Sequence, residues 1–367
     1  MAIDKVVSAS ISDDAVTSAK VSYNKNQFRN IIINGDMSLA QRATSTSSIT
    51  SGAYHTVDRF KTNISSLGTW TQSQDTTVPT GQGFAKSLKM DCTTADGSPS
   101  SGDFLNIGTR FEGQMLQYLK KGTSSAESLT LSFWVRSNKT GTYTAELYDS
   151  DNTRYVSKTY SISSADTWEK KTITYDGDTT GAFGNDANVS LSVFFWLGAG
   201  SDYTGGTFNN GTWGSGGNNT RVSSSQVNLA DSTSNEWYIT GVQLETGTSA
   251  SDFEFLPFDV NLKRCQRYYW RNNGANSAFG SGVFANATTP QLYVKFPTAM
   301  RASPSFSFGS NIYVGSGSSS NTVSSLSANS GFSESFVTCT LSGNGGSAAN
   351  GAVGYITNGY IDGSSEL

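Results

Sequence analysis

Apolar and polar residues alternate in short runs along most of the chain from about residue 30 onward, and turn residues separate the runs. In residues 128–137, Leu129, Leu131, Phe133 and Val135 alternate with polar or amphipathic neighbours. Because successive side chains of a strand point to opposite faces of a sheet, this alternation predicts a half-buried β-strand. Further strands are predicted at residues 57–61, 69–74, 85–91, 104–108, 141–148, 168–175, 189–197 and 237–244. About ten strands at this spacing predict an all-β sandwich of jelly-roll type.

Three stretches refine this pattern. Residues 189–197 (VSLSVFFWL) are the most apolar run and predict a central strand. Residues 31–33 form a short apolar, strand-like run that the turn residues 34–36 close. Residues 110–119 have apolar side chains at helical spacing, although Gly113 weakens that prediction.

The pattern divides the chain into four parts. Residues 1–29 are a polar arm, residues 30–258 the sandwich, residues 259–270 a short linker or helix, and residues 271–367 a second, smaller C-terminal β-domain. In this last part we predict strands at residues 277–284, 291–296, 305–308, 311–314, 332–341 and 351–361. The serine-rich residues 314–330 predict a surface loop.

The N-terminal arm carries too few apolar residues to form a core of its own. Ile11, Val16 and Val21 recur every five residues, which fits neither a helix nor a strand. We expect these residues to anchor the arm on another protein or on copies of the same chain. The alternative is an arm ordered on its own domain.

Composition and charge narrow the classes of function. Only 15% of the 367 residues are charged, 38 are glycine and 12% are aromatic, which suits short strands joined by polar turns. The net charge of −4 and the absence of a long basic run argue against a nucleic-acid surface. No apolar run reaches the roughly 18 residues of a membrane span, and no signal peptide is expected. Three cysteines, far apart and without a CxxC motif, predict neither a disulfide framework nor a zinc site.

Catalytic constellations are scarce. The one histidine, His55, stands at the head of a predicted strand, where a structural role is expected. The acidic residues are scattered, and Asp149 and Asp151 have turn-like surroundings. We therefore expect no enzyme and no cofactor, although a carboxylate pair for glycoside hydrolysis is compatible with a β-fold.

A glycine- and asparagine-rich loop at residues 198–219 follows the predicted central strand. It carries Tyr203, Phe208 and Trp213, which are candidates for binding a sugar because rings stack on its apolar face while short polar groups bond its hydroxyls. The alternative, which the pattern favours, is that these rings pack on the domain or on a neighbouring subunit.

Two segments carry a resemblance to a known family. The run GVQLETG–SDFEFLPF–LKRCQRYYW near residues 241–270, and NIIINGDMSLAQR at residues 30–42 with YHTVDRF at residues 54–60, resemble segments of bacteriophage tail-fibre and related virion proteins. The resemblance implies a sandwich like that of carbohydrate-binding modules. It also implies a homotrimer, and an ion near the chain start to which Asp36 could contribute. Thr240 stands where such modules often have Asp, so a metal is not predicted.

Together these observations predict a non-enzymatic tail-fibre protein that mediates attachment to host surface polysaccharide. In this interpretation, residues 1–29 contact other virion proteins, and the chain is made in the host bacterial cytoplasm and incorporated into the virion. Two alternatives stay open. One is a structural virion protein, such as a head fibre, capsid decoration or tail adaptor, and the other is a polysaccharide-degrading tail spike.

Overall fold

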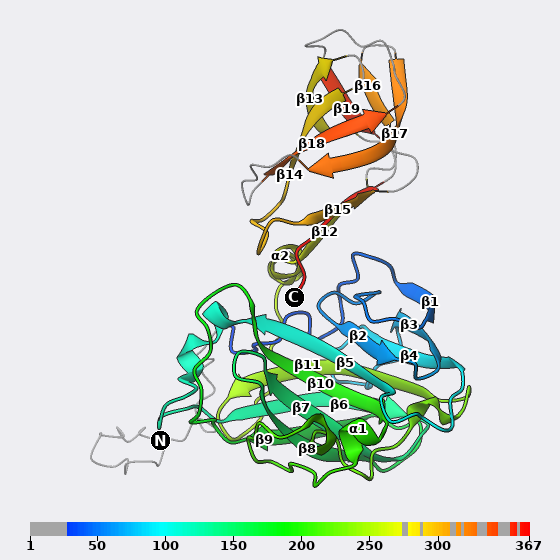
Figure 1. Cartoon of the computed structure of the whole chain (residues 1–367). Helices are drawn as coiled ribbons and strands as arrows, with labels where there is room; N and C mark the ends of the chain where they lie inside the picture. Colours follow the sequence, from blue (N-terminus) through cyan, green and yellow to red (C-terminus); the bar gives the residue numbers. More distant parts are fainter. Residues whose placement is uncertain are drawn as a thin grey trace, which may run out of the picture.

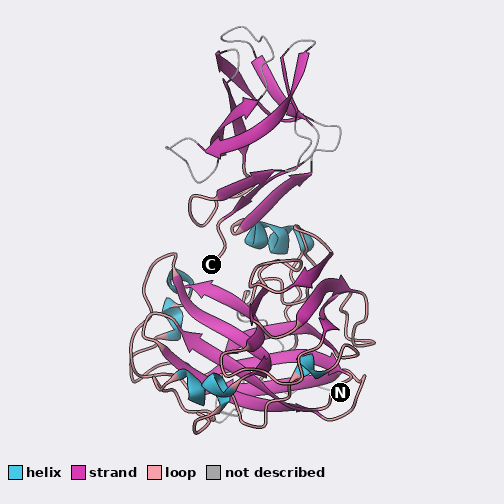
Figure 2. Cartoon of the chain, turned by 45° about the vertical axis from the view of Figure 1, so that its right-hand side comes forward, coloured by secondary structure: helices cyan, strands magenta, loops and turns pink. Residues whose placement is uncertain are grey.

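The strands form two antiparallel sheets that face each other, which confirms the predicted all-β sandwich (Figures 1 and 2). The computed structural model describes residues 28–273, 278–286, 289–308, 313–316, 319–328, 336–343, 353–357 and 360–367. The arm residues Ile11, Val16 and Val21 therefore lie outside the described residues.

The first sheet has six strands in the order β1-β3-β4-β11-β6-β9. Their bounds are β1 Ser45–Ile49, β3 Thr69–Asp75, β4 Ser87–Thr94, β11 Glu236–Thr246, β6 Leu129–Ser137 and β9 Glu169–Tyr175. The second sheet has five strands in the order β2-β5-β10-β7-β8. Their bounds are β2 Lys61–Ser65, β5 Phe104–Glu112, β10 Val189–Ala199, β7 Gly141–Asp149 and β8 Arg154–Ile162. The strand predicted to be central, β10, is the middle strand of this sheet.

The core lies between the two sheets. Every second residue of β6 and β10 points into it, including Phe133 and Phe195, whose ring centres are 5.0 Å apart in an edge-to-face contact. Trp70 and Trp237 are also completely buried. Such rings each bury a large apolar area, which makes them the main source of stabilisation of a sandwich.

Several local predictions differ from the structure. Residues 31–33 are buried but form no strand, although the Ile31 amide donates to the Leu244 carbonyl at 2.9 Å. Residues 110–112 continue β5, because pairing with β10 outweighs the local helical spacing. Two 3₁₀ turns follow, η2 Gly113–Met115 and η3 Gln117–Leu119. The strand predicted at residues 57–61 is wrong, because residues 57–60 form a turn and β2 begins only at Lys61. β1 and β8 have no counterpart among the predicted strands.

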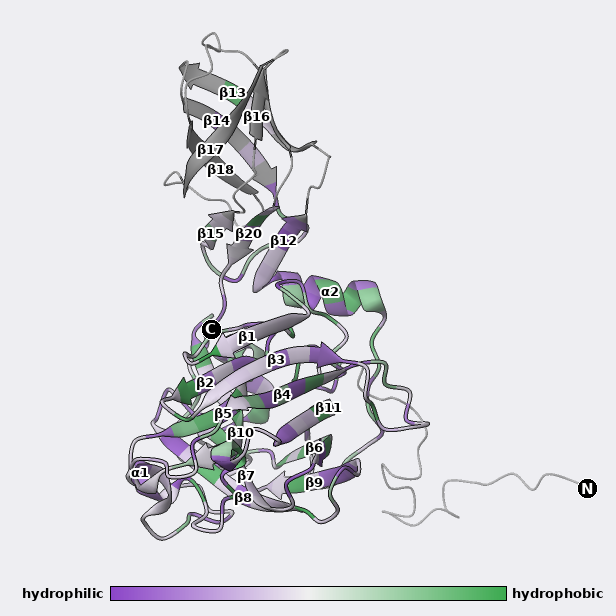
Figure 3. Cartoon of the chain, turned by 90° about the vertical axis from the view of Figure 1, so that its right-hand side faces the viewer, coloured by the Kyte–Doolittle hydropathy of each residue, from purple (hydrophilic) through white to green (hydrophobic). Residues whose placement is uncertain are grey.

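The remaining helices are short. They are α1 Ser201–Thr204, η4 Asn218–Thr220, η5 Leu229–Asp231 and α2 Phe258–Gln266. α2 lies between the sandwich and the strands beyond it (Figure 3). None of the helices in the described ranges has the length and apolar character needed to span a membrane.

Beyond α2 the chain builds a three-stranded sheet and a closed barrel (Figure 1). The sheet has the order β12-β20-β15, with bounds β12 Tyr269–Asn273, β20 Tyr360–Ser364 and β15 Ser305–Phe308. The barrel has the order β13-β14-β18-β17-β16-β19. Its bounds are β13 Ala278–Asn286, β14 Thr289–Lys295, β16 Tyr313–Ser316, β17 Ser319–Ala328, β18 Phe336–Gly343 and β19 Val353–Thr357. The loop predicted at residues 314–330 is wrong, since β17 pairs there with a strand on each side.

The last residues of the chain return to the sandwich. Glu366 forms ion pairs with Arg42 and with the buried Arg59. The Leu367 carbonyl accepts hydrogen bonds from the Tyr54 hydroxyl at 3.0 Å and from Arg110 Nη1 at 2.8 Å. β20 is thereby tied to the sandwich as well as to its own sheet. The domain boundaries proposed from the sequence stay predictions.

Candidate functional site

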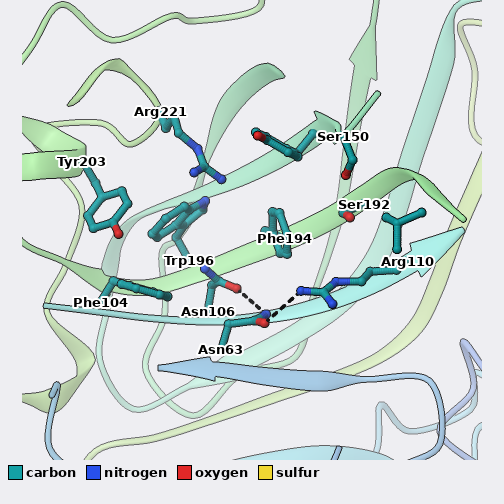
Figure 4. A pocket seen from close by; sticks show the side chains of 12 residues that line it. Asn63, Phe104, Asn106, Arg110, Ser150, Ser192, Phe194, Trp196, Tyr203 and Arg221 are labelled. Atoms are coloured by element: carbon teal, nitrogen blue, oxygen red, sulfur yellow. Dashed lines mark hydrogen bonds between the residues drawn. The ribbon is translucent and has the colours of Figure 1, made fainter. Parts of the chain in front are cut away.

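A cavity of about 370 Å³ opens on the outer face of the five-stranded sheet (Figure 4). Its lining combines aromatic rings with amides, hydroxyls and two guanidinium groups. The lining residues are Asn63, Phe104, Asn106, Arg110, Tyr148, Ser150, Val189, Ser192, Phe194, Trp196, Tyr203 and Arg221. They include no aspartate, glutamate, histidine or cysteine.

The alternating direction of the side chains along β10 determines which residues form the floor of this cavity. Phe195 points into the core, so its neighbours Phe194 and Trp196 point to the outer face. Asn106 of β5 pairs directly with Trp196, which puts an amide beside the indole. Residues 193–197 (VFFWL) are apolar on both faces for this reason: one face makes the core and the other makes the floor, whereas serine holds the two preceding outward positions, 190 and 192.

A glycine makes room for one of the floor rings. A Cβ atom on Gly108 of β5 would lie 2.5 Å from a ring carbon of Phe194, closer than side chains tolerate. Because glycine has no side chain, the Phe194 ring can lie across the neighbouring strand. The absence of a Cβ at Gly108 therefore determines the shape of the floor.

The other floor ring is fixed from below by a buried carboxylate. Trp196 Nε1 donates to Glu146 Oε2 at 2.9 Å, and Glu146 is completely buried. Arg221 pairs with the same carboxylate, at 2.7 Å from its Nε, and lies 5.3 Å from the Trp196 ring centre. Pairing compensates the buried charge and orients both groups, because charge-assisted hydrogen bonds are strong and directional.

One side of the cavity is aromatic. Tyr203, on the short helix α1, lies with its ring centre 5.2 Å from that of Phe104 and 5.3 Å from that of Trp196. Partial burial raises the pKa of the Tyr203 hydroxyl above its ordinary value, so the group is a neutral donor and acceptor at neutral pH.

A polar group of side chains lies beside these rings, as Figure 4 shows. Asn63 Nδ2 donates to Asn106 Oδ1 at 2.9 Å, and Arg110 Nη2 approaches Asn63 Oδ1 at 3.5 Å. Arg110 also donates to Leu367, so the last residue of the chain helps to position a group of the cavity. Amides and guanidinium groups offer hydrogen bonds in fixed directions, as recognition of hydroxyl groups requires.

The three aromatic residues predicted from the loop do not lie together. Tyr203 lines the cavity, whereas Phe208 is half-buried outside it. Trp213 packs against the core, with its indole nitrogen donating to the Asp176 carbonyl at 2.7 Å and Lys121 Nζ 5.5 Å from its ring. Whether any of the three binds a glycan stays a prediction.

The other candidate residues have local partners. Asp36 Oδ1 accepts from Ser38 Oγ at 3.1 Å and from Asn261 Nδ2 at 3.3 Å. Within the described ranges no three His, Cys, Asp or Glu side chains are grouped so that they could hold a metal ion. His55 lines a different cavity, and its Nε2 lies 3.3 Å from the Ser51 carbonyl oxygen.

Sequence reasoning missed most of the residues that line this cavity. Phe104, Trp196 and Arg221 come from three separate segments, and only pairing of β5 with β10 brings the first two together. One signal was present: Phe194 and Trp196 occupy the outward positions of a central strand, where polar side chains are common in a sandwich. An apolar outward pair in such a strand indicates either a covering loop or a binding surface.

No family model and no curated protein matches the chain. A solved structure of the enzymatically active domain of tailspike protein 4 from bacteriophage CBA120 is similar to 60% of this chain, at 15% identity and a TM-score of 0.32. The chain spans only 22% of that protein's length.

Two further structures are similar to the same extent. A putative sugar-binding protein from Bacteroides thetaiotaomicron matches 59% of this chain and 100% of its own length, at 13% identity and a TM-score of 0.30. A structure described as a family 4 carbohydrate-binding module matches 58% of this chain and 98% of its own, at 10% identity and a TM-score of 0.28. These values record likeness to such sandwiches and do not show a function.

Proposed function

We propose that this chain is a non-enzymatic virion protein of the bacteriophage tail-fibre class and that it binds host surface polysaccharide on the outer face of its five-stranded sheet. The supporting observation is the cavity that the rings of Tyr203 and Phe104 line together with the polar side chains of Asn63, Asn106 and Arg110. A sugar ring presents an apolar face and a rim of hydroxyls. The cavity offers a ring to stack on and polar groups for the rim.

Binding without bond cleavage is part of the proposal. Glycoside hydrolysis uses a pair of carboxyl groups beside the scissile bond. The side chains that line the cavity include no carboxylate, and the carboxylate beneath it, Glu146, is completely buried and paired with Arg221. The lining therefore favours a binding site.

The remaining parts of the proposal concern assembly. Residues 1–29 would attach the chain to other virion proteins, and three copies would form the fibre. Attachment of several weak sites to one polysaccharide raises the overall affinity without any new contact.

The test compares two aromatic residues of the same loop. We would measure retention of the full-length chain on an array of bacterial surface polysaccharides, for the wild type, Tyr203→Ala and Phe208→Ala. Removing the ring of Tyr203 should weaken the strongest array interaction about 3- to 10-fold, which is the effect of losing one aromatic contact. Phe208→Ala is the matched control, because this half-buried ring does not line the cavity.

Three results would contradict the proposal. Retention of no array polysaccharide would favour a structural virion protein without receptor contact. Equal retention of both variants would place the binding surface elsewhere. Release of soluble oligosaccharides from a retained polysaccharide would indicate a tail spike.

A further inference from the structure

We infer a second saccharide-binding site, on the outer face of the opposite, six-stranded sheet. A cavity of about 330 Å³ lies there, within the size range of small-ligand sites. It is lined by Gly81, Gln82, Phe84, Ser132, Trp134, Lys170, Gly241, Asp252, Phe253 and Phe255. None of these residues belongs to the cavity on the five-stranded sheet, so this inference goes beyond the proposed function. Only its role in attachment to a host rests on that function.

The floor of this second cavity is an indole on a sheet face. Trp134 of β6 points outward, between Thr240 of β11 and Lys170 of β9, which are its direct neighbours in the two pairings. It is half-buried, whereas Trp70, Trp196 and Trp237 are at most 1% exposed. Trp134 thus presents part of its ring at the surface of the sheet.

A bulge beside Trp134 keeps this floor open. The pairing of β11 with β6 shifts register between Thr240 and Gln243, and Gly241 within the bulge has a φ of +63°. A Cβ atom on Gly241 would lie 2.6 Å from Phe84 and 3.1 Å from Trp134. Glycine in a strand marks a close approach, and bulges are frequent next to functional sites.

Three phenylalanines form the wall of this cavity. The ring centre of Phe84 lies 5.1 Å from those of Phe253 and Phe255, and the latter two are 4.8 Å apart. Phe255 is 50% exposed. A large apolar side chain that stays exposed after packing against two others indicates a surface for contact.

The side chains of Gln243 and Glu245, near the end of β11, hold this wall in place. Glu245 accepts from the Ser251 amide at 2.8 Å and from its hydroxyl at 2.6 Å. Gln243 Oε1 accepts from the Glu254 amide at 2.9 Å. The segment after β11, which carries Phe253 and Phe255, is therefore held on the sheet by hydrogen bonds. These bonds fix the rings before any ligand arrives, which lowers the entropy cost of binding.

The rim supplies polar groups of both signs. Lys170 and Asp252 are exposed, and the described part of the chain gives neither side chain a hydrogen-bond or ion-pair partner. An ammonium group donates hydrogen bonds and a carboxylate accepts them, so the pair matches the hydroxyls of a sugar in both roles. A flat ring for the apolar face and a rim of donors and acceptors specify a saccharide.

The experiment uses the full-length chain and the same array of bacterial surface polysaccharides. The informative variants are Trp134→Ala and Lys170→Ala, with Trp134→Phe as the conservative replacement. Trp168→Ala is the matched control, because Trp168 is half-buried beside Tyr238 of the same sheet and does not line the cavity. Solution mass by light scattering is measured for each variant.

Trp134→Ala should weaken the strongest array interaction about 3- to 10-fold, Lys170→Ala less, and Trp134→Phe least. A chain with Tyr203→Ala should retain residual binding that the added Trp134→Ala removes. Equal retention of Trp134→Ala and the Trp168→Ala control would overturn this inference alone. An effect of Trp134→Ala without an effect of Tyr203→Ala would overturn the proposed site and leave this one standing.

Two further outcomes also decide against the inference. A change in solution mass with unchanged retention would show that the surface joins copies of the chain. Retention of no array polysaccharide by the wild type would overturn both sites.

Discussion

The guanidinium carbon of Arg59 lies 3.4 Å from the centre of the Tyr268 ring. Arg59 belongs to the YHTVDRF segment and Tyr268 to the CQRYY segment, so the two stretches that enclose the sandwich in the sequence meet in space. The Tyr268 hydroxyl donates to Glu112 Oε1 at 2.5 Å. Arg59 is 1% exposed and pairs with Glu366, which brings the last residues of the chain to the same point.

The ion pair of Arg59 with Glu366 predicts a large loss of stability in Glu366→Ala. The variant leaves the Arg59 cation buried without a carboxylate, and breaking a buried ion pair from one side costs about 3–5 kcal/mol. Urea unfolding followed by tryptophan fluorescence measures the loss. Glu127→Ala is the control, because Glu127 pairs with Lys120 on the surface and such pairs contribute about 0–1 kcal/mol. Equal losses in the two variants would show that residues 366–367 do not secure the junction.

Asp58 predicts a pH dependence of stability. Burial raises the pKa of this carboxyl from 3.8 to about 6, against the opposing effects of Arg42 and of hydrogen bonds from Gln41. Between these values the folded chain binds more protons at Asp58 than the unfolded chain, so the contribution of Asp58 to stability falls as pH rises from about 4 to about 6. A pKa difference of about 2 corresponds to at most about 3 kcal/mol.

The comparison of wild type with Asp58→Asn isolates this contribution. Asparagine does not titrate, so the stability of the variant relative to the wild type should increase between pH 4 and pH 6 and then become constant. Urea unfolding at pH 4, 5, 6 and 7 gives the difference. Any change in hydrogen bonding to Gln41 shifts all four values alike. A difference that does not change with pH, or that decreases, would contradict the raised pKa.

The sandwich could be predicted from the sequence because its signals are local. Alternation marked β6, and the most apolar run of the chain marked β10 as central. The cavity on the five-stranded sheet could not, because it depends on register. Glu146 occupies an outward position of β7, which predicts a solvated carboxylate, yet Arg221 and Trp196 from distant segments cover it. Likewise, no local feature of the sequence distinguishes Tyr203, which lines the cavity, from Trp213 of the same loop, which packs against the core.

Gly108→Ala should disturb the floor of the first cavity. The added Cβ would lie 2.5 Å from the Phe194 ring, so the ring or the strand must move. Overpacking of this kind costs about 1–3 kcal/mol, and the moved ring should weaken polysaccharide retention as well. Gly97→Ala is the control, because an added Cβ meets no atom within 4 Å there. Thermal unfolding and array retention are measured on both, and a stable variant with normal retention would show that Phe194 is not fixed by Gly108.

The pair of Glu146 and Arg221 should be strongly coupled. Glu146→Leu leaves the Arg221 guanidinium, which lies over Trp196, without its carboxylate, and Arg221→Met leaves a completely buried carboxylate without its cation. Each single change should cost about 3–5 kcal/mol. The double change removes both charges, so its cost should be smaller than the sum by about 1–3 kcal/mol. Urea unfolding of the four proteins gives the coupling energy.

The exposed pair of Lys120 and Glu127, changed in the same way, should show a coupling of about 0.2–1 kcal/mol. Equal coupling in the two pairs would mean that Glu146 is solvated and does not hold Trp196 in the floor of the cavity.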